Sequence, residues 1–312
     1  MTLRVAYLVK RSSWRAFQET KAAGRLRALQ RRKDPTVATL KPTHEAHQRT
    51  VDEVMEAFQS LGVDAVEITS STRDIKRSRF SLVVTVGGDG TLLRASHYVS
   101  DVPVLGINSA PDSSVGFFCG AAGWSRKEIT GQVERVGLLE TLDRALDGRL
   151  QARVLSRMRV TIGREIVSSR ILNDALFCHR SPAATSRYLI EAKGINEEHK
   201  SSGLWVGPAA GSTAAQRSAG GKVLPLESDK IQLVVREPYT PKGERYRLQR
   251  VLIGPGETIT VRSKMRDALI FLDGPDLVAK PEFGDVITFS RSSEPLSLLG
   301  LATRRSVSSK RD

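Results

Sequence analysis

The chain has 312 residues and a formal net charge of +14, but its basic residues are dispersed and aromatic residues make up only 5%, which argues against a nucleic-acid-binding surface. Its 40% of hydrophobic residues is typical of a globular protein, and without a membrane-length apolar run or a signal-peptide pattern we expect a cytoplasmic protein with no membrane partner. The two cysteines, Cys119 and Cys178, are too few for a disulfide framework or a four-cysteine metal site.

Strand and helix patterns alternate over residues 1–142. Strand patterns occupy residues 4–9, 65–68, 82–86 and 104–107, and helical spacing occupies residues 14–32, 43–62 and 91–98, with a break at 34–42. This alternation predicts an α/β domain with a parallel sheet over residues 1–142. In such sheets, ligands bind outside the carboxyl ends of the strands.

A glycine-rich turn connects the strand pattern at 82–86 to the helical pattern at 91–98. Its sequence is Gly87-Gly88-Asp89-Gly90-Thr91. Glycines allow the backbone to approach a pyrophosphate and to direct N–H groups at it, and Asp89 is the only anionic group in the turn. The turn therefore indicates phosphate chemistry, although a plain strand-to-helix turn could have the same residues.

The pattern of predicted elements changes after residue 142, from alternating strands and helices to mainly short strands. A short connecting helix is expected at 143–150. Strand patterns follow at 154–162, 165–176, 188–192, 204–207, 231–235, 249–253, 258–261, 268–272 and 286–290. Many short strands separated by glycine and proline predict a β-rich, mainly antiparallel domain over residues 143–300. Residues 301–312 are polar and basic, and we expect a flexible tail there.

Two further motifs lie in this second region. Asn173 and Asp174 are placed inside the predicted strand 165–176, where unpaired polar groups would be costly unless a ligand bonds to them. A strand-end turn is the alternative. Gly211-Ser212-Thr213 begins a loop of small residues that could contact a nucleotide, and the alternative is a helix cap.

In this order, the three motifs resemble those of the NAD kinase family, which has a Gly-Gly-Asp-Gly-Thr loop, an Asn-Glu pair and a Gly-Ser-Thr-Ala loop. The resemblance covers roughly residues 1 to 300 and implies a Rossmann-like α/β N-terminal domain followed by a C-terminal β-sandwich. The segments 9–14 and 200–204 look closer to the branch that contains mitochondrial-type NAD kinases and plant NADH kinases.

The resemblance implies transfer of the terminal phosphoryl group of ATP to the 2′-hydroxyl of the adenosine ribose of NAD or NADH. Asp89 is the candidate base for the hydroxyl proton. The backbone N–H groups of Gly87, Gly88, Gly90 and Thr91 would hold phosphates. Mg²⁺ or another divalent cation would accompany ATP, and no metal site made by protein side chains is expected.

The same resemblance assigns the remaining contacts. Asn108 falls in a second nucleotide-contacting loop, and Asn173 with Asp174 would hold the ribose and nicotinamide portions of the dinucleotide. Gly211, Ser212 and Thr213 would also contact the nucleotide. The chain departs from the family at Asp174, where Glu is more usual, and at Ala215, where many members have Tyr; the second departure puts the detailed pose of NAD in doubt.

Several features have no assigned part in this reaction. His44 and His47 are predicted to lie on a helix surface, the cysteines are expected to be small buried hydrophobes, and Asp273-Gly274 is either a late Asp-Gly turn of the family or a simple hairpin turn. A homo-oligomer is expected, with a homodimer favoured. The alternatives are a diacylglycerol- or sphingosine-type lipid kinase, a phosphofructokinase and a non-catalytic nucleotide sensor. The sequence does not decide whether the acceptor is NAD or NADH, or whether the donor is ATP or polyphosphate.

Overall fold

The computed structural model describes residues 3–69, 72, 74–124, 136–240 and 245–301. The chain forms two compact units, the first from Met1–Arg153 with Ser297–Asp312 and the second from Val154–Leu296. In the described part of the chain, no helix is long and apolar enough to cross a membrane. The predicted flexible tail falls almost wholly on residues 302–312, which lie outside the described residues.

The first unit is built on a seven-stranded sheet in the order β2-β1-β3-β4-β19-β6, with β5 beside β4. Its strands are β1 (Arg4–Val9), β2 (Asp64–Glu67), β3 (Leu82–Gly87), β4 (Val104–Asn108), β5 (Ala121–Ala122), β6 (Ala152–Leu155) and β19 (Leu296–Leu299). Strands β1 to β5 pair in parallel, and β19 pairs in parallel with β4. The predicted parallel α/β domain is confirmed.

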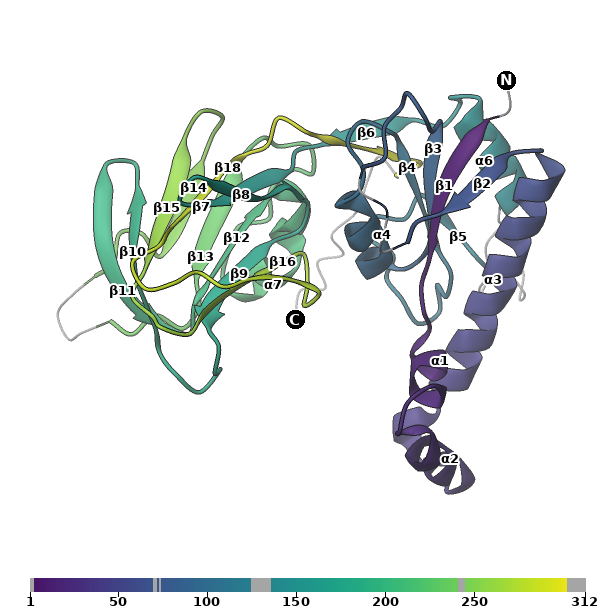
Figure 1. The fold of residues 1–312 in the computed structure, drawn as a ribbon, viewed down its shortest axis with the longest axis horizontal. Helices are drawn as coiled ribbons and strands as arrows, with labels where there is room; N and C mark the ends of the chain where they lie inside the picture. Colours follow the sequence, from purple (N-terminus) through teal and green to yellow (C-terminus); the bar gives the residue numbers. More distant parts are fainter. Residues whose placement is uncertain (1–2, 70–71, 73, 125–135, 241–244, 302–312) are drawn as a thin grey trace, which may run out of the picture. The chain divides into compact units, whose positions relative to one another are not determined.

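Helices cover both faces of this sheet (Figure 1). Helices α3 (Leu40–Ser60) and α6 (Leu138–Leu146) share one hydrophobic core with the sheet, through side chains such as Phe58, Leu142 and Val84. Helix α4 (Asp89–Ser96) lies on the other face. Because α6 packs on this core, it belongs to the first unit, and the boundary falls after Arg153 rather than at the predicted residue 142.

The N-terminal helices differ from the prediction in two ways. The expected helix at 14–32 is two helices, α1 (Ser13–Gln18) and α2 (Ala23–Arg31). Between them, the Thr20 hydroxyl donates to the Phe17 carbonyl and accepts the Ala22 N–H, which favours a turn over a continuous helix. After the short η1 (Pro35–Val37), α3 begins within the predicted break, since Pro42 lies in its first turn, where no N–H donor is needed.

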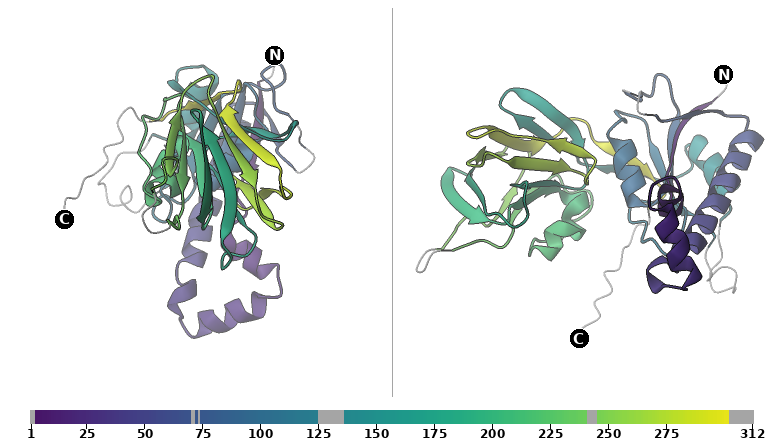
Figure 2. Two further views of the ribbon diagram at one scale, coloured as in Figure 1. Left: turned by 90° about the vertical axis from the view of Figure 1, so that its left-hand side faces the viewer. Right: turned by 60° about the horizontal axis from the view of Figure 1, so that its bottom comes forward.

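The second unit is a sandwich of two six-stranded sheets, both antiparallel (Figure 2). One sheet has the order β11-β10-β15-β18-β7-β8, from β11 (Ile195–Ser201), β10 (Ser186–Ala192), β15 (Thr258–Ser263), β18 (Val286–Arg291), β7 (Met158–Ile162) and β8 (Glu165–Ile171). The other has the order β14-β13-β12-β9-β16-β17, from β14 (Arg250–Ile253), β13 (Ile231–Val235), β12 (Leu204–Pro208), β9 (Ala175–His179), β16 (Ala268–Leu272) and β17 (Leu277–Ala279). Their inner faces form one core, and the predicted β-sandwich is confirmed.

The predicted strand at 165–176 is wrong. The chain leaves one sheet at the end of β8 and enters the other at the start of β9, so Leu172, Asn173 and Asp174 cross between the two sheets. An apolar run interrupted by two polar residues reads as one strand, yet the polar pair marks the change of sheet. Cys119 and Cys178 are half-buried, so the expectation of buried cysteines holds only in part.

Candidate active site

The glycine loop lies where the parallel-sheet rule places a ligand site, at the carboxyl end of β3. All six residues of β3 are buried, and α4 begins at Asp89. A Cβ atom on Gly87 would lie 2.2 Å from the Thr91 hydroxyl oxygen, and one on Gly88 would lie 2.7 Å from that of Ser114. Nothing lies within 4 Å of a Cβ on Gly90. Packing thus requires glycine at position 87, would need the Ser114 hydroxyl to move for a side chain at position 88, and leaves space beside Gly90.

Asp89 connects the glycine loop to a loop that follows β4. One carboxylate oxygen accepts the N–H of Phe118 at 2.7 Å, and the other accepts the N–H of Phe117 at 2.8 Å. The side chain is half-buried. Each oxygen keeps further acceptor capacity, so the carboxylate can be held in one orientation and still accept a proton from a bound hydroxyl.

Asn108, at the end of β4, holds the first part of that same loop. Its side-chain amide donates to the Ser114 carbonyl at 2.9 Å and accepts the Ala110 N–H at 3.3 Å. Gly116 is in the left-handed region (φ +60°), and a Cβ atom there would lie 2.5 Å from the Asn108 amide nitrogen. Asn108 therefore shapes the loop, and in this structure its amide is committed to it.

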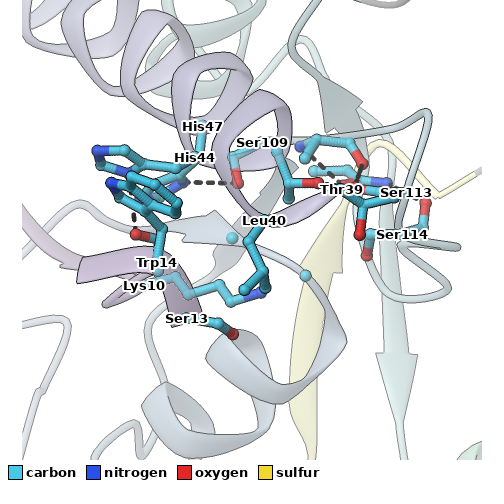
Figure 3. A pocket seen from close by; sticks show the side chains of 16 residues that line it. Lys10, Ser13, Trp14, Thr39, Leu40, His44, His47, Ser109, Ser113 and Ser114 are labelled. Atoms are coloured by element: carbon cyan, nitrogen blue, oxygen red, sulfur yellow. Dashed lines mark hydrogen bonds between the residues drawn. The ribbon is translucent and has the colours of Figure 1, made fainter. Parts of the chain in front are cut away.

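A cavity of about 280 Å³ adjoins the glycine loop within the first unit (Figure 3). Its walls come from the segment after β1, the start of α3, the glycine loop and the loop after β4. The lining residues are Lys10, Ser12, Ser13, Trp14, Thr39, Leu40, Thr43, His44, His47, Gly87, Gly88, Asn108, Ser109, Ala110, Ser113 and Ser114. Three of the predicted site residues, Gly87, Gly88 and Asn108, are among them.

The prediction that both histidines lie on a helix surface is wrong. His47 is 5% exposed, and its Nδ1 lies 2.8 Å from the Ser109 hydroxyl. His44 is half-buried, with its Nδ1 2.9 Å from the Ser12 hydroxyl. The i, i+3 spacing identified a shared face correctly, but that face lines the cavity because the chain after β1 folds back over α3. No group of three His, Cys, Asp or Glu side chains suited to a metal ion occurs in the described ranges.

The Asn-Asp pair of the second unit is held by Asp273, in the turn between β16 and β17. The Asp273 carboxylate accepts the backbone N–H groups of Leu172, Asn173 and Asp174 at 2.7 to 3.0 Å. The Asp273 N–H in turn donates to the Asp174 carbonyl at 2.8 Å. The Asp-Gly turn, which the sequence left as a possible simple hairpin, is thus also a clamp on the crossing segment.

Gly211 lies against this crossing segment. A Cβ atom on Gly211 would lie 1.7 Å from the Asn173 carbonyl oxygen, and one on Gly207 would lie 2.4 Å from the same atom. The Gln216 side chain also donates to this carbonyl, at 3.4 Å. The structure therefore brings together the second and third predicted motifs, Asn173-Asp174 and Gly211–Thr213.

The residues of the third motif have different environments. Gly211 and Ser212 belong to the short helix η2 (Ala209–Thr213), which precedes α7 (Ala215–Ser218). The Ser212 hydroxyl is fully buried, donates to the Ala209 carbonyl at 2.7 Å and accepts the Leu224 N–H at 2.9 Å. It therefore fixes the loop. Thr213 is half-buried, and its hydroxyl is the more accessible of the two.

Asp174 has the most perturbed environment of the predicted site residues. It is 6% exposed, and one carboxylate oxygen accepts from the Asn173 side-chain amide at 2.7 Å. Burial raises the pKa of its carboxyl from 3.8 to about 7, and the neighbouring Asp273 carboxylate adds to the rise. A carboxyl group that titrates near neutrality in a polar cluster is characteristic of functional sites.

The sequence reasoning missed Lys10, Trp14 and the serines that line the cavity. The parallel-sheet rule could have found them, because Lys10 follows β1 directly and the carboxyl ends of β1, β3 and β4 adjoin. Asp89 with Asn108 forms one cluster in the first unit, and Asn173 with Asp174 and Gly211 forms another in the second.

Comparison with known proteins adds independent findings. Residues 8–135 match the family model described as the ATP-NAD kinase N-terminal domain. The chain is 31% identical over 275 residues to a probable NADH kinase of Oryza sativa subsp. japonica, with 81% of each chain covered. It is 32% identical over 229 residues to the NADH kinase of Arabidopsis thaliana, covering 70% of this chain and 72% of that protein.

Solved structures show the same fold. An NAD kinase from Archaeoglobus fulgidus in complex with ATP superposes with a TM-score of 0.63 at 19% identity, covering 96% of this chain and 94% of the other. Yeast NADH kinase complexed with NADH gives the same TM-score of 0.63 at 14% identity, covering 97% of this chain and 84% of the other.

Proposed function

The chain belongs to the NAD kinase family, and we propose how its residues perform the ATP-dependent phosphorylation of NAD or NADH. It is a phosphotransferase that makes NADP(H), and the plant NADH kinases among its relatives confirm the resemblance to that branch. One observation carries the assignment of residues: Asp89 follows two glycines at the carboxyl end of a buried parallel strand, at the start of α4.

The glycine loop receives the phosphates of the donor. The helix begins at Asp89 with Gly88 as its N-cap, and no side chain caps it. The free N–H groups and the positive end of the helix dipole favour an anion there. Gly90 leaves the space that a close approach of phosphate oxygens needs, which supports its assignment beside Gly87 and Gly88. The Thr91 N–H donates to the Gly88 carbonyl at 3.0 Å, so the predicted phosphate contact of that N–H is not supported.

Asp89 is the base that accepts the proton of the ribose 2′-hydroxyl. A sugar hydroxyl is a poor nucleophile, so a carboxylate within hydrogen-bond reach lowers the barrier as the phosphorus–oxygen bond forms. The two N–H groups from Phe117 and Phe118 fix the orientation of this carboxylate. Asn108 supports the same loop and so acts on Asp89 through it.

The cluster of the second unit receives the acceptor dinucleotide. We assign the polar contacts to Asn173, Asp174 and Thr213 and the close backbone approach to Gly211. The buried hydroxyl of Ser212 supports the loop from inside, so we assign it a structural part in place of the predicted nucleotide contact. The amide of Asn173 and the carboxyl of Asp174 supply both a donor and an acceptor for ribose hydroxyls.

Other parts of the proposal rest on general chemistry. Mg²⁺ would be bound by the phosphates of ATP, with waters completing its coordination, and would neutralise charge on the transferring phosphoryl group. A cytoplasmic location and a homodimer stay predictions from the sequence. Sedimentation of the purified protein tests the homodimer.

One experiment tests the activity and its acceptor. The purified protein is incubated with ATP and Mg²⁺ together with NAD, NADH, diacylglycerol or sphingosine in parallel, and the products are identified by mass. A phosphorylated dinucleotide is expected, and the ratio of rates with NAD and NADH gives the preference. Phosphorylated lipid with unchanged dinucleotide would reject the proposal and restore the lipid kinase alternative.

A further inference from the structure

The helical segment after β1 concentrates much of the positive charge of the chain. Residues 11–34 hold eight basic and two acidic side chains, so they carry +6 of the net +14 although they make up less than a tenth of the sequence. All eight basic side chains are exposed: Arg11, Arg15, Lys21, Arg25, Arg27, Arg31, Arg32 and Lys33. We call residues 11–34 the basic arm. The expectation of no nucleic-acid-binding surface rested on dispersal of basic residues over the whole chain, and the basic arm is the exception to that dispersal.

The basic arm folds around a small core of its own. Helices α1 and α2 lie by the N-terminal end of α3, away from the parallel sheet (Figure 1). Trp14, Leu26 and Val37 form the buried core, and Leu29 and Leu40 pack against it. Because this core takes the apolar side of α2, the opposite side of the helix is left to the charged side chains.

The cations of α2 and its C-cap form two rows along the helix. Arg27 and Arg31 are four residues apart on one row, and Arg25 and Arg32 are seven residues apart on the other. Gly24 lies between the rows, and nothing lies within 4 Å of a Cβ atom placed on it. The surface between the two rows is therefore open to the close approach of a chain of anions.

Few carboxylates compensate the charge of the basic arm. Of its two acidic residues, Glu19 forms ion pairs with both basic side chains of α1. Asp34 interacts electrostatically with Arg25, although hydrogen bonds at the start of η1 do more to lower the pKa of its carboxyl. Among the described residues, the two other arginines of α2 and its C-cap Arg32 form no ion pair. These guanidinium groups are left to an external anion.

The composition of this surface favours a phosphate backbone over other anionic partners. Six of the eight cations are arginines, whose planar guanidinium groups bind phosphate oxygens in pairs. A protein interface or a membrane-bound helix also needs exposed apolar side chains, but Phe17 is the one large hydrophobic residue exposed in residues 11–34. Single strands stack their bases on aromatic rings, and the ring of Trp14 is buried in the core of the arm. A duplex, which presents only its backbone, fits best.

We propose that the basic arm binds the phosphodiester backbone of double-stranded nucleic acid without reading its sequence. The two rows of arginines on α2 would contact phosphates, and the release of counterions would supply most of the affinity. Duplex DNA and duplex RNA share this chemistry. None of the residues of α2 lines the cavity beside the glycine loop, so this binding is separate from the proposed kinase activity.

Fluorescence anisotropy tests the proposal with labelled DNA and RNA duplexes of about 20 base pairs and a single strand of the same length, at about 50 mM and about 200 mM salt. The arm variant carries three substitutions, Arg27→Gln, Arg31→Gln and Arg32→Gln. A second variant has lysine at the same three positions and keeps the charge. The matched control removes three exposed basic side chains from the second unit, by Arg164→Gln, Arg187→Gln and Lys193→Gln. Thermal unfolding and the rate of NAD phosphorylation check every variant.

We expect the wild-type protein to bind both duplexes with a Kd of about 1–100 μM at the lower salt, and at least about tenfold more weakly at the higher salt. The arm variant should bind about ten- to a hundredfold more weakly, and the slope of log affinity against log salt should fall by about two to three. The lysine variant should stay within about threefold of wild type, and the control within about twofold. The rate of NAD phosphorylation should not change in any of them.

Unchanged duplex affinity in the folded arm variant, or an equal loss in the control, would overturn the proposal. Tighter binding of the single strand than of either duplex would also reject it. Titrations with polyglutamate and with phosphatidylserine vesicles test the other partners: binding of either through the arm, without duplex binding, would reassign this surface to an acidic protein or to a lipid surface. Binding of one duplex or both supports the proposal, and the tighter one identifies the source of the backbone.

Discussion

The two clusters of predicted site residues use aspartate in opposite ways. In the first unit, Asp89 is half-buried, and two loop N–H groups orient its carboxylate. In the second unit, Asp174 is almost fully buried beside Asp273, and its pKa is raised to about 7. The difference shows that the same residue type serves as an oriented acceptor between two loop N–H groups in one region and as a group that can hold its proton at neutral pH in the other.

The largest effect is expected from Asp89→Asn. An amide keeps the shape of the carboxylate but cannot take the ribose proton, so kcat should fall about a hundredfold to ten-thousandfold. The amide can also accept only one of the two loop N–H groups, so the free energy of unfolding should fall by about 1–3 kcal/mol. Steady-state kinetics and urea unfolding measure both. Near-native kcat in the folded variant would remove Asp89 as the base.

The contrast between the aspartates is tested by Asp174→Asn. The unfolded carboxyl titrates near 3.8 and the folded one near 7, so the wild-type protein should lose stability as pH rises through this window. The loss should reach at most about 4 kcal/mol and persist above about pH 7. The variant should lack this dependence on pH, so its free energy of unfolding relative to that of the wild type should rise from about pH 4 to about pH 8.

Urea unfolding across this pH range measures the effect in the protein without ligand. Asp276→Asn is the control, since Asp276 is exposed in the same β16–β17 turn as Asp273, and it should keep the wild-type slope. A constant difference in stability between Asp174→Asn and wild type at every pH would show that folding does not raise the pKa of Asp174.

A smaller effect is expected from Asn173→Ala. The change removes one ligand contact and the hydrogen bond to Asp174, and leaves Asp89 in place. The KM for NAD should rise about tenfold, since one such contact contributes about 1.4 kcal/mol, and kcat should stay within about threefold. Asn196→Ala, on the exposed edge strand β11, is the control. Unchanged KM and kcat would make the pair a structural turn only.

The smallest effects should separate two glycines of the loop. Gly90→Ala meets no neighbour and lies in a helix, so the free energy of unfolding should rise by about 0.5–1 kcal/mol while the KM for ATP rises a few fold. Gly88→Ala meets the Ser114 hydroxyl and should lower stability by about 1 kcal/mol. Thermal unfolding and ATP kinetics compare them. An unchanged KM for ATP in Gly90→Ala would exclude close phosphate approach there.

Patterns local in sequence were sufficient for the glycine loop but not for the Asn-Asp pair. The run at 82–86 predicts a buried strand because its residues are apolar or β-branched, and every residue of β3 is buried in the structure. The pair at 173–174 interrupts an apolar run, and only the pairing of β8 and β9 with different sheets shows that it lies at a crossing. Periodicity does not report which sheet a strand joins.

Residues that depend on distant contacts escaped the sequence reasoning. His47 is buried because Ser109, 62 positions away, faces it, and Asp273 clamps a segment about 100 residues earlier. Strand β11 was missed because its sequence, Ile195 to Ser201, is mostly polar and charged, as an edge strand with one exposed face can be. Such residues carry no local signal of their role.

The return of the chain to its first sheet has a consequence for the order of synthesis. Strand β19, at residues 296–299, lies between β4 and β6 in that sheet, although the whole second unit is made before it. A chain that emerges N-terminus first therefore has to keep its first sheet incomplete until the sandwich has left the ribosome, because only the carboxyl end of β4 is already paired, with β5, and the edge beside Val104 is open. Truncation before Ser297 should thus leave an exposed strand edge, which favours aggregation even if the sandwich itself is intact.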